Sequence, residues 1–505
     1  MVAHEPYPLY YTVGNSRREL YRPIDLAENK RGYRYGRAIA DPMFPYKQSY
    51  RSTSPRPHYA RLSFEDADRW MHFTTNALVT TNERGWRMVR SNVCAREGTL
   101  YYEVKIHRGI PSLSAEPSTT SPEDPAAASA PQPHVRMGWA RREAPLDAPV
   151  GFDGYSYGIT DARFEPIHRS RPAKFFHPKP KSKAKNAYKA AVAPPALITL
   201  PIQDAEIREG DVIGLELALP SLSLHQKIVS GIYNPAVDIG DGFDQPHPYL
   251  EPGAEGIPDV IRDRIPVPYK GNSYFETLDH VSSKSMEVYA DRETNLSNLA
   301  QSAALVGGGP TVSAANRDAL KQAPNPNHEN PIMRTLPHSA IRVYKNGKLI
   351  GTAFENLLAF LPPASAPSKT MGAREGFDDG MVGYFPAVAC FFGGIAEVNF
   401  GDSGTGFWCP PAHVANPVLS TKGKGGMEST KVGPDADAGE AVMGVDATGE
   451  KKGWNPGRMA RAVGGRYKEQ VAEDVVWDLV DEVDFFMQDG GYEGTVGGAL
   501  EGGGV

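Results

Sequence analysis

The sequence predicts a mainly β protein: an antiparallel β-sandwich with long disordered insertions and a separate C-terminal α-helix. Several short segments alternate apolar and polar residues with a period of two, which is typical of half-buried strands. One Asn-Gly pair joins two such segments as a hairpin turn. The chain also holds 51 glycines and 44 prolines among 505 residues, roughly a fifth against an average of about 12%. This composition indicates a turn-rich core with excursions between its strands.

The predicted strands are short and separated by turn signals. Segment 99–106 is the clearest, because its apolar residues alternate with polar ones: Leu100, Tyr102, Val104 and Ile106. Segments 135–139, 211–219 and 384–400 predict further strands, the last split around Gly393 and Gly394. In segment 341–354, Asn346 and Gly347 provide the positive φ angles of a two-residue type I′ turn. Short strands of this kind favour an antiparallel sandwich.

The remaining segments predict the domain organisation. Residues 1–57 form an N-terminal extension and 58–409 the sandwich, followed by a flexible linker over 410–466, a helix over 467–488 and a disordered tail over 489–505. Insertions that cannot pack are expected at about 111–134, 171–196, 221–270, 281–335 and 361–380. Lengthening a surface loop costs little, because each doubling adds only about 0.6 kcal/mol of closure entropy.

Apolar residues recur every three or four positions near the C-terminus and predict a helix. They are Val471, Val475, Leu479, Val483 and Phe486, and Ala472 and Val476 widen this stripe. A helix of this length gains its stability by burying the stripe. It either packs back on the sandwich or docks into a groove of a partner, and the Gly-rich sequence before it favours docking.

The charged and reactive residues predict neither an enzyme nor a metal or cofactor site. The formal net charge is −6, which argues against a general nucleic-acid coat. The three cysteines have no C-x-x-C spacing, which excludes a zinc finger unless histidines are its main ligands. They also argue against a disulfide scaffold and indicate a reducing compartment. The N-terminus lacks the apolar stretch of a signal peptide, and no segment predicts a membrane span. GDSGTG at 401–406 is similar to the nucleophile loop of serine proteases, but Ser403 has no recognisable His and Asp partners, since His413 lies among Pro and Ala.

A basic run with interleaved aromatic residues lies inside one predicted insertion. It includes Lys179, Lys181, Lys183 and Lys185. The run is either a solubilising loop or a flexible contact to phosphates or to an acidic partner, in the nucleosome for example.

Three segments together resemble a SPRY domain: 85–106, 134–161 and 341–357. The sequence LDAPVGFDGYSYGI, with RREA before it, resembles the SPRY subunit of the COMPASS histone methyltransferase complex, the Bre-two and Ash-two-like family. KEQVAEDVVWDLVDEV resembles the C-terminal docking helix of that family. Only about 57 residues precede the sandwich and zinc-binding cysteines are absent, so the fungal form fits better than the animal form.

The resemblance implies a bent β-sandwich in a nuclear scaffold subunit without catalytic activity. Such a subunit pairs with a WD-repeat subunit, and the pair supports the catalytic SET subunit in methylating lysine four of histone H-three. An acidic segment of the WD-repeat partner would bind a basic surface whose matching residues are Arg90, Arg136, Pro149, Phe152 and Arg163. Phe152 replaces the usual Tyr, so a hydroxyl contact is lost. Arginine suits an acidic peptide because its planar fork meets carboxylates bidentately, but each Arg can instead form an internal salt bridge.

The same resemblance implies that the C-terminal helix docks to a small dimeric subunit of the DPY-thirty type. The anchors would be Val471, Val475, Val476, Leu479, Val483 and Phe486, with Trp477 as a further anchor or an edge cover. The main alternative is a generic SPRY adaptor, for example of a ubiquitin ligase. That alternative gives the helix no role, and three cysteines cannot supply the RING domain that such adaptors usually carry.

Overall fold

The computed structural model describes seven long stretches of the chain: 57–111, 131–172, 206–240, 322–365, 382–401, 406–414 and 460–488. It also describes short pieces at 9–13, 16–22, 27–29, 33–37, 51–52, 262–263, 267–269, 272–278, 280, 282–290 and 380. Within these residues, no helix is long and apolar enough to cross a membrane.

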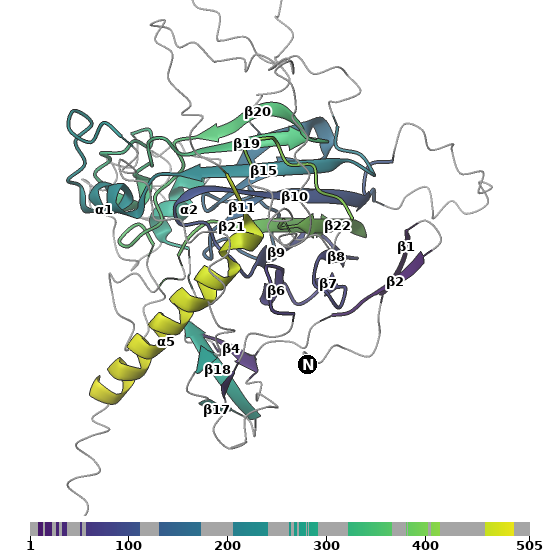
Figure 1. Ribbon diagram of the computed structural model, residues 1–505, viewed down its shortest axis with the longest axis horizontal. Coiled ribbons are helices and arrows are strands. Elements are labelled where there is room, and N and C mark those ends of the chain that lie inside the picture. Colours follow the sequence, from purple (N-terminus) through teal and green to yellow (C-terminus); the bar gives the residue numbers. More distant parts are fainter. Residues whose placement is uncertain are drawn as a thin grey trace, which may run out of the picture.

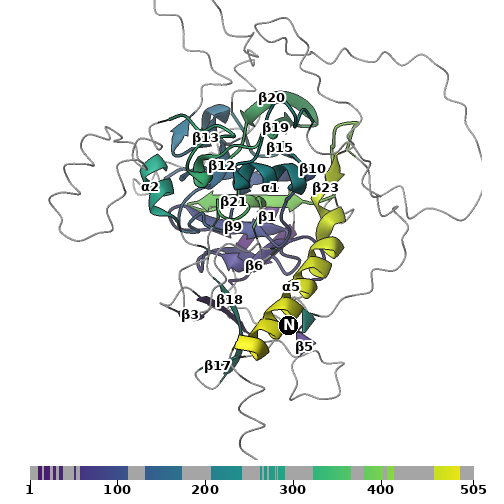
Figure 2. The ribbon, with the colours of Figure 1, turned by 90° about the vertical axis from the view of Figure 1, so that its left-hand side faces the viewer.

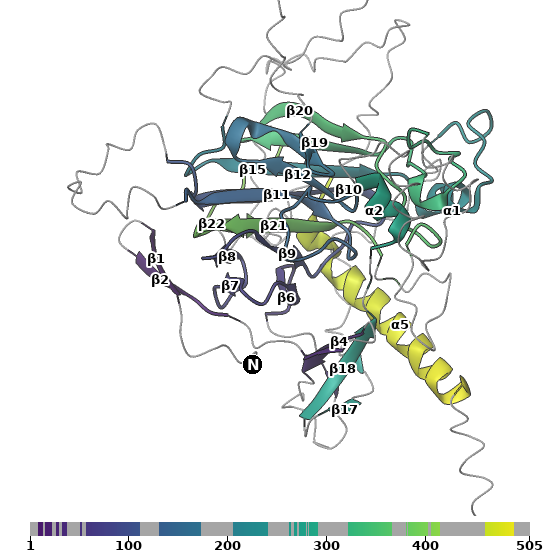
Figure 3. The ribbon, with the colours of Figure 1, turned by 180° about the vertical axis from the view of Figure 1, so that it is seen from behind.

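Two antiparallel sheets lie face to face and form a sandwich (Figures 1 and 3). In order across the first sheet, the strands are β20 (Lys348–Glu355), β19 (Ala340–Lys345), β15 (Val212–Leu219), β10 (Gly98–Arg108), β22 (Gly394–Asn399), β8 (Val79–Asn82) and β7 (His72–Phe73). The second sheet contains β14 (Arg171–Pro172), β13 (Pro166–His168), β12 (Ser156–Thr160), β11 (His134–Ala140), β21 (Phe385–Phe391), β9 (Arg87–Ser91) and β6 (Leu62–Ala67). The predicted mainly β fold, with a separate C-terminal helix, is confirmed.

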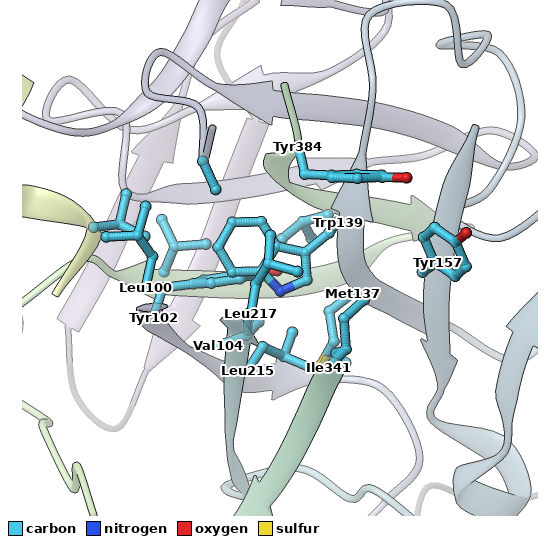
Figure 4. Packing of buried hydrophobic residues seen from close by; sticks show 14 of the residues in the cluster. Leu100, Tyr102, Val104, Met137, Trp139, Tyr157, Leu215, Leu217, Ile341 and Tyr384 are labelled. Carbon is cyan, nitrogen blue, oxygen red and sulfur yellow. The ribbon is translucent and has the colours of Figure 1, made fainter. Parts of the chain in front are cut away.

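The main core lies between the two sheets (Figure 4). Tyr102 of β10 and Trp139 of β11 are both fully buried, and their rings meet edge to face with centres 5.1 Å apart. Beside them, Gly138 lets β11 approach β12 closely, because a Cβ at this position would lie 1.9 Å from the carbonyl oxygen of Tyr157. The inward residues of both sheets therefore share one close-packed interior.

The two predicted hairpins exist, and one turn differs by a residue from the prediction. Asn346 (φ 50°) and Gly347 (φ 78°) join β19 to β20, which confirms the type I′ turn. Between β21 and β22 the positive φ angles belong to Phe392 (44°) and Gly393 (82°), whereas Gly394 begins β22. A Cβ at Gly394 would lie 2.2 Å from the carbonyl oxygen of His134, so this glycine is needed for close strand approach rather than for the turn.

Strand β10 is buried on both faces over residues 100–104, so the prediction of a half-buried strand was wrong for its outer face at Tyr101 and Glu103. Tyr101 and Glu103 point away from the core, yet both are fully buried. The segment 406–414 covers them: the Cys409 N–H donates to Glu103 at 2.9 Å, and the Trp408 ring packs 5.5 Å from that of Tyr101. A segment about 300 residues away in sequence thus provides the second layer.

Parts of three predicted insertions fold onto the sandwich. Helix α1 (Leu222–Ser230) lies at one end of the sheets and buries Leu224, His225, Ile228 and Val229 (Figure 2). Its N-cap is Ser221, whose Oγ accepts the Leu224 N–H, and Gly231 ends it at φ 76°. Helix α2 (Lys284–Ala290), the 3₁₀ turn η5 (Pro331–Met333) and the buried residues 361 and 364–365 belong to the other two segments. These residues pack because each segment contributes apolar side chains of its own.

The other two predicted insertions are described only at their ends. Residues 112–130 of the 111–134 insertion lie outside the described residues. The first two residues of the 171–196 insertion form β14 at the edge of the second sheet, and its remaining residues also lie outside the described ranges.

The described pieces of the N-terminal extension also pair with the rest of the chain. β1 (Leu9–Val13) and β2 (Ser16–Leu20) form a hairpin, and Tyr21 then bridges to Phe73 of β7. β4 (Tyr33–Arg37) lies between β3 (Ala27–Asn29) and β18 (Asn272–Leu278), which pairs in turn with β17 (Val267–Tyr269). β5 (Arg51–Ser52) pairs with β16 (Arg262–Asp263).

Both ends of the predicted 410–466 linker are attached to the first sheet. Val414 forms a parallel bridge with Ala460, and the Ala460 N–H donates to the His413 carbonyl at 3.0 Å. β23 (Arg461–Ala462) then pairs in parallel with β10, and the 3₁₀ turn η7 (Val463–Arg466) leads into α5 (Tyr467–Gln488). Val414 and Ala460 therefore lie side by side on the sandwich, so the length of chain between them does not set the position of the helix.

Candidate functional site

Arg136 occupies the outer face of the second sheet, where it is half-buried. On β11 it is opposite Thr160 of β12 and Ala389 of β21. Its guanidinium carbon lies 4.7 Å from the centre of the Trp86 ring, and Trp86 packs against Phe391 at 5.1 Å. Within the described residues, the guanidinium of Arg136 forms no hydrogen bond or ion pair. The stacked guanidinium is thus held in place with its N–H groups available to an acidic ligand.

The turn that carries Pro149 and Phe152 lies on the same face. The Phe152 N–H donates to the Pro149 carbonyl at 3.0 Å, and the Phe152 side chain is 51% exposed. A Cβ at Gly158 would lie 2.5 Å from the Val150 carbonyl oxygen, so the turn rests on β12 at this glycine. Gly158 and Thr160 are consecutive residues on the outer face of β12, and Thr160 is the cross-strand neighbour of Arg136. The turn that rests on Gly158 therefore lies beside Arg136 on this face.

Arg163 is exposed at the end of β12, in the 3₁₀ turn η2 (Ala162–Phe164), with a positive φ of 62°. Asp161 caps this turn by accepting the Ala162 N–H at 2.7 Å. Arg163 therefore follows Thr160, the cross-strand neighbour of Arg136, by three residues.

Arg90 does not belong to this surface, which corrects the prediction. Its side chain is 1% exposed and forms a bidentate ion pair with Asp66, at 2.7 and 2.8 Å. The remaining guanidinium nitrogen donates to the carbonyls of Arg141 and Ala144, at 2.9 and 2.7 Å. Burial and four hydrogen bonds make Arg90 an internal structural residue.

The sequence reasoning missed Trp86 and His134, both of which border Arg136. His134 lies two residues before Arg136 on the same face, and its Nδ1 lies 3.0 Å from Asp161. This hydrogen bond raises the pKa of His134, and burial opposes it. Burial lowers the pKa of Arg136, and the nearby Asp161 charge opposes that shift. Side chains two residues apart on a strand point to the same face. This period of two identifies His134 from Arg136 on β11, and Trp86 from Met88 on β9.

The base of α5 is fixed to the sandwich (Figure 2). Arg466 Nε donates to the Cys94 carbonyl at 2.7 Å, and the Gln470 side-chain oxygen lies 3.1 Å from Cys94 Sγ. An ion pair between Arg461 and Glu469, at 2.6 Å, ties β23 to the first turn of the helix. The helix thus starts from a defined position rather than from a free tether.

Further along α5, the helix presents an apolar face to solvent. Val476, Leu479 and Val483 are 57%, 54% and 60% exposed, and their spacings of three and four residues put them on one face. Leu479 lies nine residues after Gln470, about 900° around the helix at about 100° per residue, and so faces the opposite way. The apolar face is therefore the one that the sandwich leaves uncovered.

The other predicted anchors divide between the two sides of α5. Val471 and Val475 are half-buried near the base. Trp477 packs against Gly380, where a Cβ would lie 2.2 Å from the Trp477 ring, so it faces this chain rather than a partner. The side chain of Phe486 lies outside the described residues.

Two further sequence predictions also lie outside the described residues: the lysines of the 171–196 segment, and Ser403. His413 is described: it belongs to the 406–414 segment, and its Nε2 lies 2.6 Å from Oε2 of the buried Glu216. Among the described residues, no three His, Cys, Asp or Glu side chains form a cluster that could hold a metal ion.

Comparison with known proteins identifies the family. The chain is 42% identical over 476 residues to the COMPASS component cclA of Colletotrichum higginsianum, covering 94% of this chain and 70% of that protein. The chain belongs to this COMPASS component family. It is 22% identical to the Set1/Ash2 histone methyltransferase complex subunit ASH2 of Drosophila melanogaster, over 75% of this chain and 45% of the relative. The fungal form of the family is thus the nearer of these two.

A solved human SPRY domain aligns with 65% of this chain and 94% of its own length, at 10% identity and a TM-score of 0.23. No family model matches the chain. The chain spans 63% of the length of a second cclA relative, from Aspergillus fumigatus.

Proposed function

We propose that this chain is a non-catalytic scaffold subunit of a nuclear COMPASS-type complex, which methylates lysine four of histone H-three. It binds a WD-repeat subunit through the Arg136 surface and a small dimeric subunit of the DPY-thirty type through α5, and so supports the SET-domain subunit. The names of the relatives support the complex. The observation that carries the scaffold role is the exposed apolar face of α5, because the sandwich fixes the helix base and leaves this face for a partner.

The helix–partner contact is tested with Leu479→Glu. A charge in an apolar interface is costly unless it is paired, so this variant should lose co-purification of the small subunit. The matched control is Leu349→Glu on β20, because Leu349 is 52% exposed and Leu479 is 54% exposed. The control should retain the small subunit. Equal retention by both variants would refute docking through this face.

The WD-repeat contact is tested at Arg136 with an acidic peptide from the partner subunit. Arg136→Ala removes the unpaired guanidinium and should weaken peptide binding in a fluorescence anisotropy titration. Arg136→Lys keeps the charge but loses the planar fork, so it should restore binding only in part. Arg108→Ala, an exposed arginine on the other sheet, is the control. Unchanged affinity of the Arg136 variants would remove this surface from the proposal.

Contact of the basic run with the nucleosome stays a separate proposal from charge alone. Each phosphate contact contributes about 0.9 to the slope of log K against log salt on duplex DNA. Replacing Lys179, Lys181, Lys183 and Lys185 by Gln should reduce that slope for nucleosome binding. An unchanged slope would assign the run a solubilising role.

A further inference from the structure

Helix α2 comes from one of the predicted insertions, yet it packs against the turn over residues 149–153, which we call the Phe152 turn. The Met286 side chain of α2 is 1% exposed. A Cβ at Gly154, the residue that follows the turn, would lie 2.2 Å from the Met286 sulfur and 3.3 Å from Cδ1 of Tyr289. The helix lies beside β13 (Figure 2). The glycine thus leaves the space that α2 fills.

Tyr289 of α2 also holds Arg169, which contacts the same turn from the β13–β14 hairpin. The guanidinium carbon of Arg169 lies 3.8 Å from the centre of the Tyr289 ring, and its Nη1 donates to the Tyr289 carbonyl at 2.8 Å. The Arg169 N–H donates to the Asp153 carbonyl at 2.9 Å. The Ser170 N–H donates to the Gly151 carbonyl, also at 2.9 Å. One helix therefore secures the Phe152 turn both directly and through this hairpin.

The hairpin connection itself has an unusual backbone conformation. Arg169 and Ser170 join His168 to Arg171, and their φ angles are 56° and 52°. Two positive φ angles are typical of a type I′ turn, where Asn and Gly are the usual residues. Side chains in such conformations persist where the surrounding contacts over-determine the backbone, and they gather at ligand-binding sites. The stack on Tyr289 and the two hydrogen bonds to the Phe152 turn are contacts of this kind.

We propose that α2 braces the Phe152 turn in the conformation that meets the acidic segment of the WD-repeat partner, with Tyr289 and Met286 as positioning residues. This inference rests on the proposed partner surface around Arg136. Phe152 is 51% exposed, so its side chain is available to a partner while its backbone is held by the chain behind it. A turn that is ordered before binding adds no ordering cost when the partner binds.

The brace acts on the turn and not on the charge of the surface. Arg136 is held separately, because its guanidinium carbon lies 4.7 Å from the centre of the Trp86 ring. Loosening α2 should therefore leave Arg136 in place and release only the Phe152 turn. The two parts of the surface can be perturbed one at a time.

The test measures binding of a labelled acidic peptide from the WD-repeat subunit to the full chain by fluorescence anisotropy. Tyr289→Ala removes the ring that holds Arg169. If the released turn adopts the binding conformation about a tenth of the time, affinity falls about tenfold. Tyr289→Phe keeps the ring and should retain affinity. The matched control is Tyr233→Ala, because Tyr233 is another half-buried tyrosine in a predicted insertion and packs against the main core; it should leave affinity unchanged.

Hydrogen–deuterium exchange of the free protein provides the readout of position. In Tyr289→Ala, amides of residues 149–153 should exchange faster while those of β11 stay unchanged. Lost affinity without faster exchange of the turn would make Tyr289 a direct contact of the peptide and overturn the positioning role. Met286→Val trims the contact with Gly154 and should produce the same two changes, so it decides the question if Tyr289→Ala does not fold.

The remaining outcomes separate the brace from the surface on which it acts. If Arg136→Ala weakens peptide binding and Tyr289→Ala does not, the partner surface stands and the brace is refuted. If neither variant changes affinity, the partner surface itself fails and the brace falls with it. An equal loss in Tyr233→Ala would assign the effect to general destabilisation and would also overturn the positioning role.

Discussion

Replacing Arg90 should destabilise the sandwich, because this buried arginine has an acidic partner that would be left buried without it. In Arg90→Met, the carboxylate of Asp66, itself 2% exposed, loses a bidentate pair. The carbonyls of Arg141 and Ala144 lose their donors as well. Breaking a buried pair from one side costs about 3–5 kcal/mol. The free energy of unfolding, measured by urea titration, should fall by that amount.

A matched pair of variants separates the ion pair from packing. Arg108→Met changes an exposed arginine and should stay within about 0.5 kcal/mol of the parent. Arg90→Met/Asp66→Leu removes both charges and should recover part of the loss, since an apolar replacement of a whole pair is often tolerated. A stable Arg90→Met that loses the acidic peptide would refute this reasoning and return Arg90 to the binding surface.

Three smaller perturbations test other parts of the fold. The hydrogen bond that the His134 Nδ1–H donates to the Asp161 carboxylate raises the pKa of His134, so the stability it provides is full below about pH 6.5 and is lost as pH rises through the raised value. His134→Gln should therefore cost more stability at pH 5.5 than at pH 8.5 in urea titrations, and an equal cost would contradict the pairing. Gly347→Ala places a side chain at φ 78° and should lower stability by about 1–2 kcal/mol; an unchanged urea midpoint would argue against the type I′ turn. Shortening 415–459 to eight residues should raise the free energy of unfolding by about 1.5 kcal/mol, because a shorter loop costs less closure entropy. Binding of the small subunit should stay intact, and its loss would show that the segment positions the helix.

Local features of the fold could be predicted from the sequence, because their causes lie within a few residues. Asn346 and Gly347 specify their turn by backbone conformation alone, and the stripe through Leu479 specifies a helix by spacing. The outer face of β10 could not be predicted in this way. Tyr101 and Glu103 follow a solvent-facing pattern in the sequence, and only the distant segment around Cys409 covers them.

The candidate site shows the same division. Arg90 and Arg136 are the same residue type on neighbouring parts of one sheet, and only three-dimensional contacts tell them apart. Arg90 meets Asp66, which is 24 residues away in sequence, whereas Arg136 meets an indole. For α5, periodicity finds the apolar residues, but the direction of the uncovered face depends on Gln470 reaching Cys94.

The fixed base of α5 makes the helix a lever arm. Leu479 lies 13 residues beyond Arg466, so at about 1.5 Å per residue it is about 20 Å from the contact with Cys94. A tilt of about 10° at the base would displace Leu479 by about 3.5 Å, which is close to the diameter of a methyl group. Side chains at the base of the helix, such as Gln470, therefore set the direction of the helix axis and the position of its apolar face. A change at the base would redirect the apolar face of Val476, Leu479 and Val483 without altering any of these three residues.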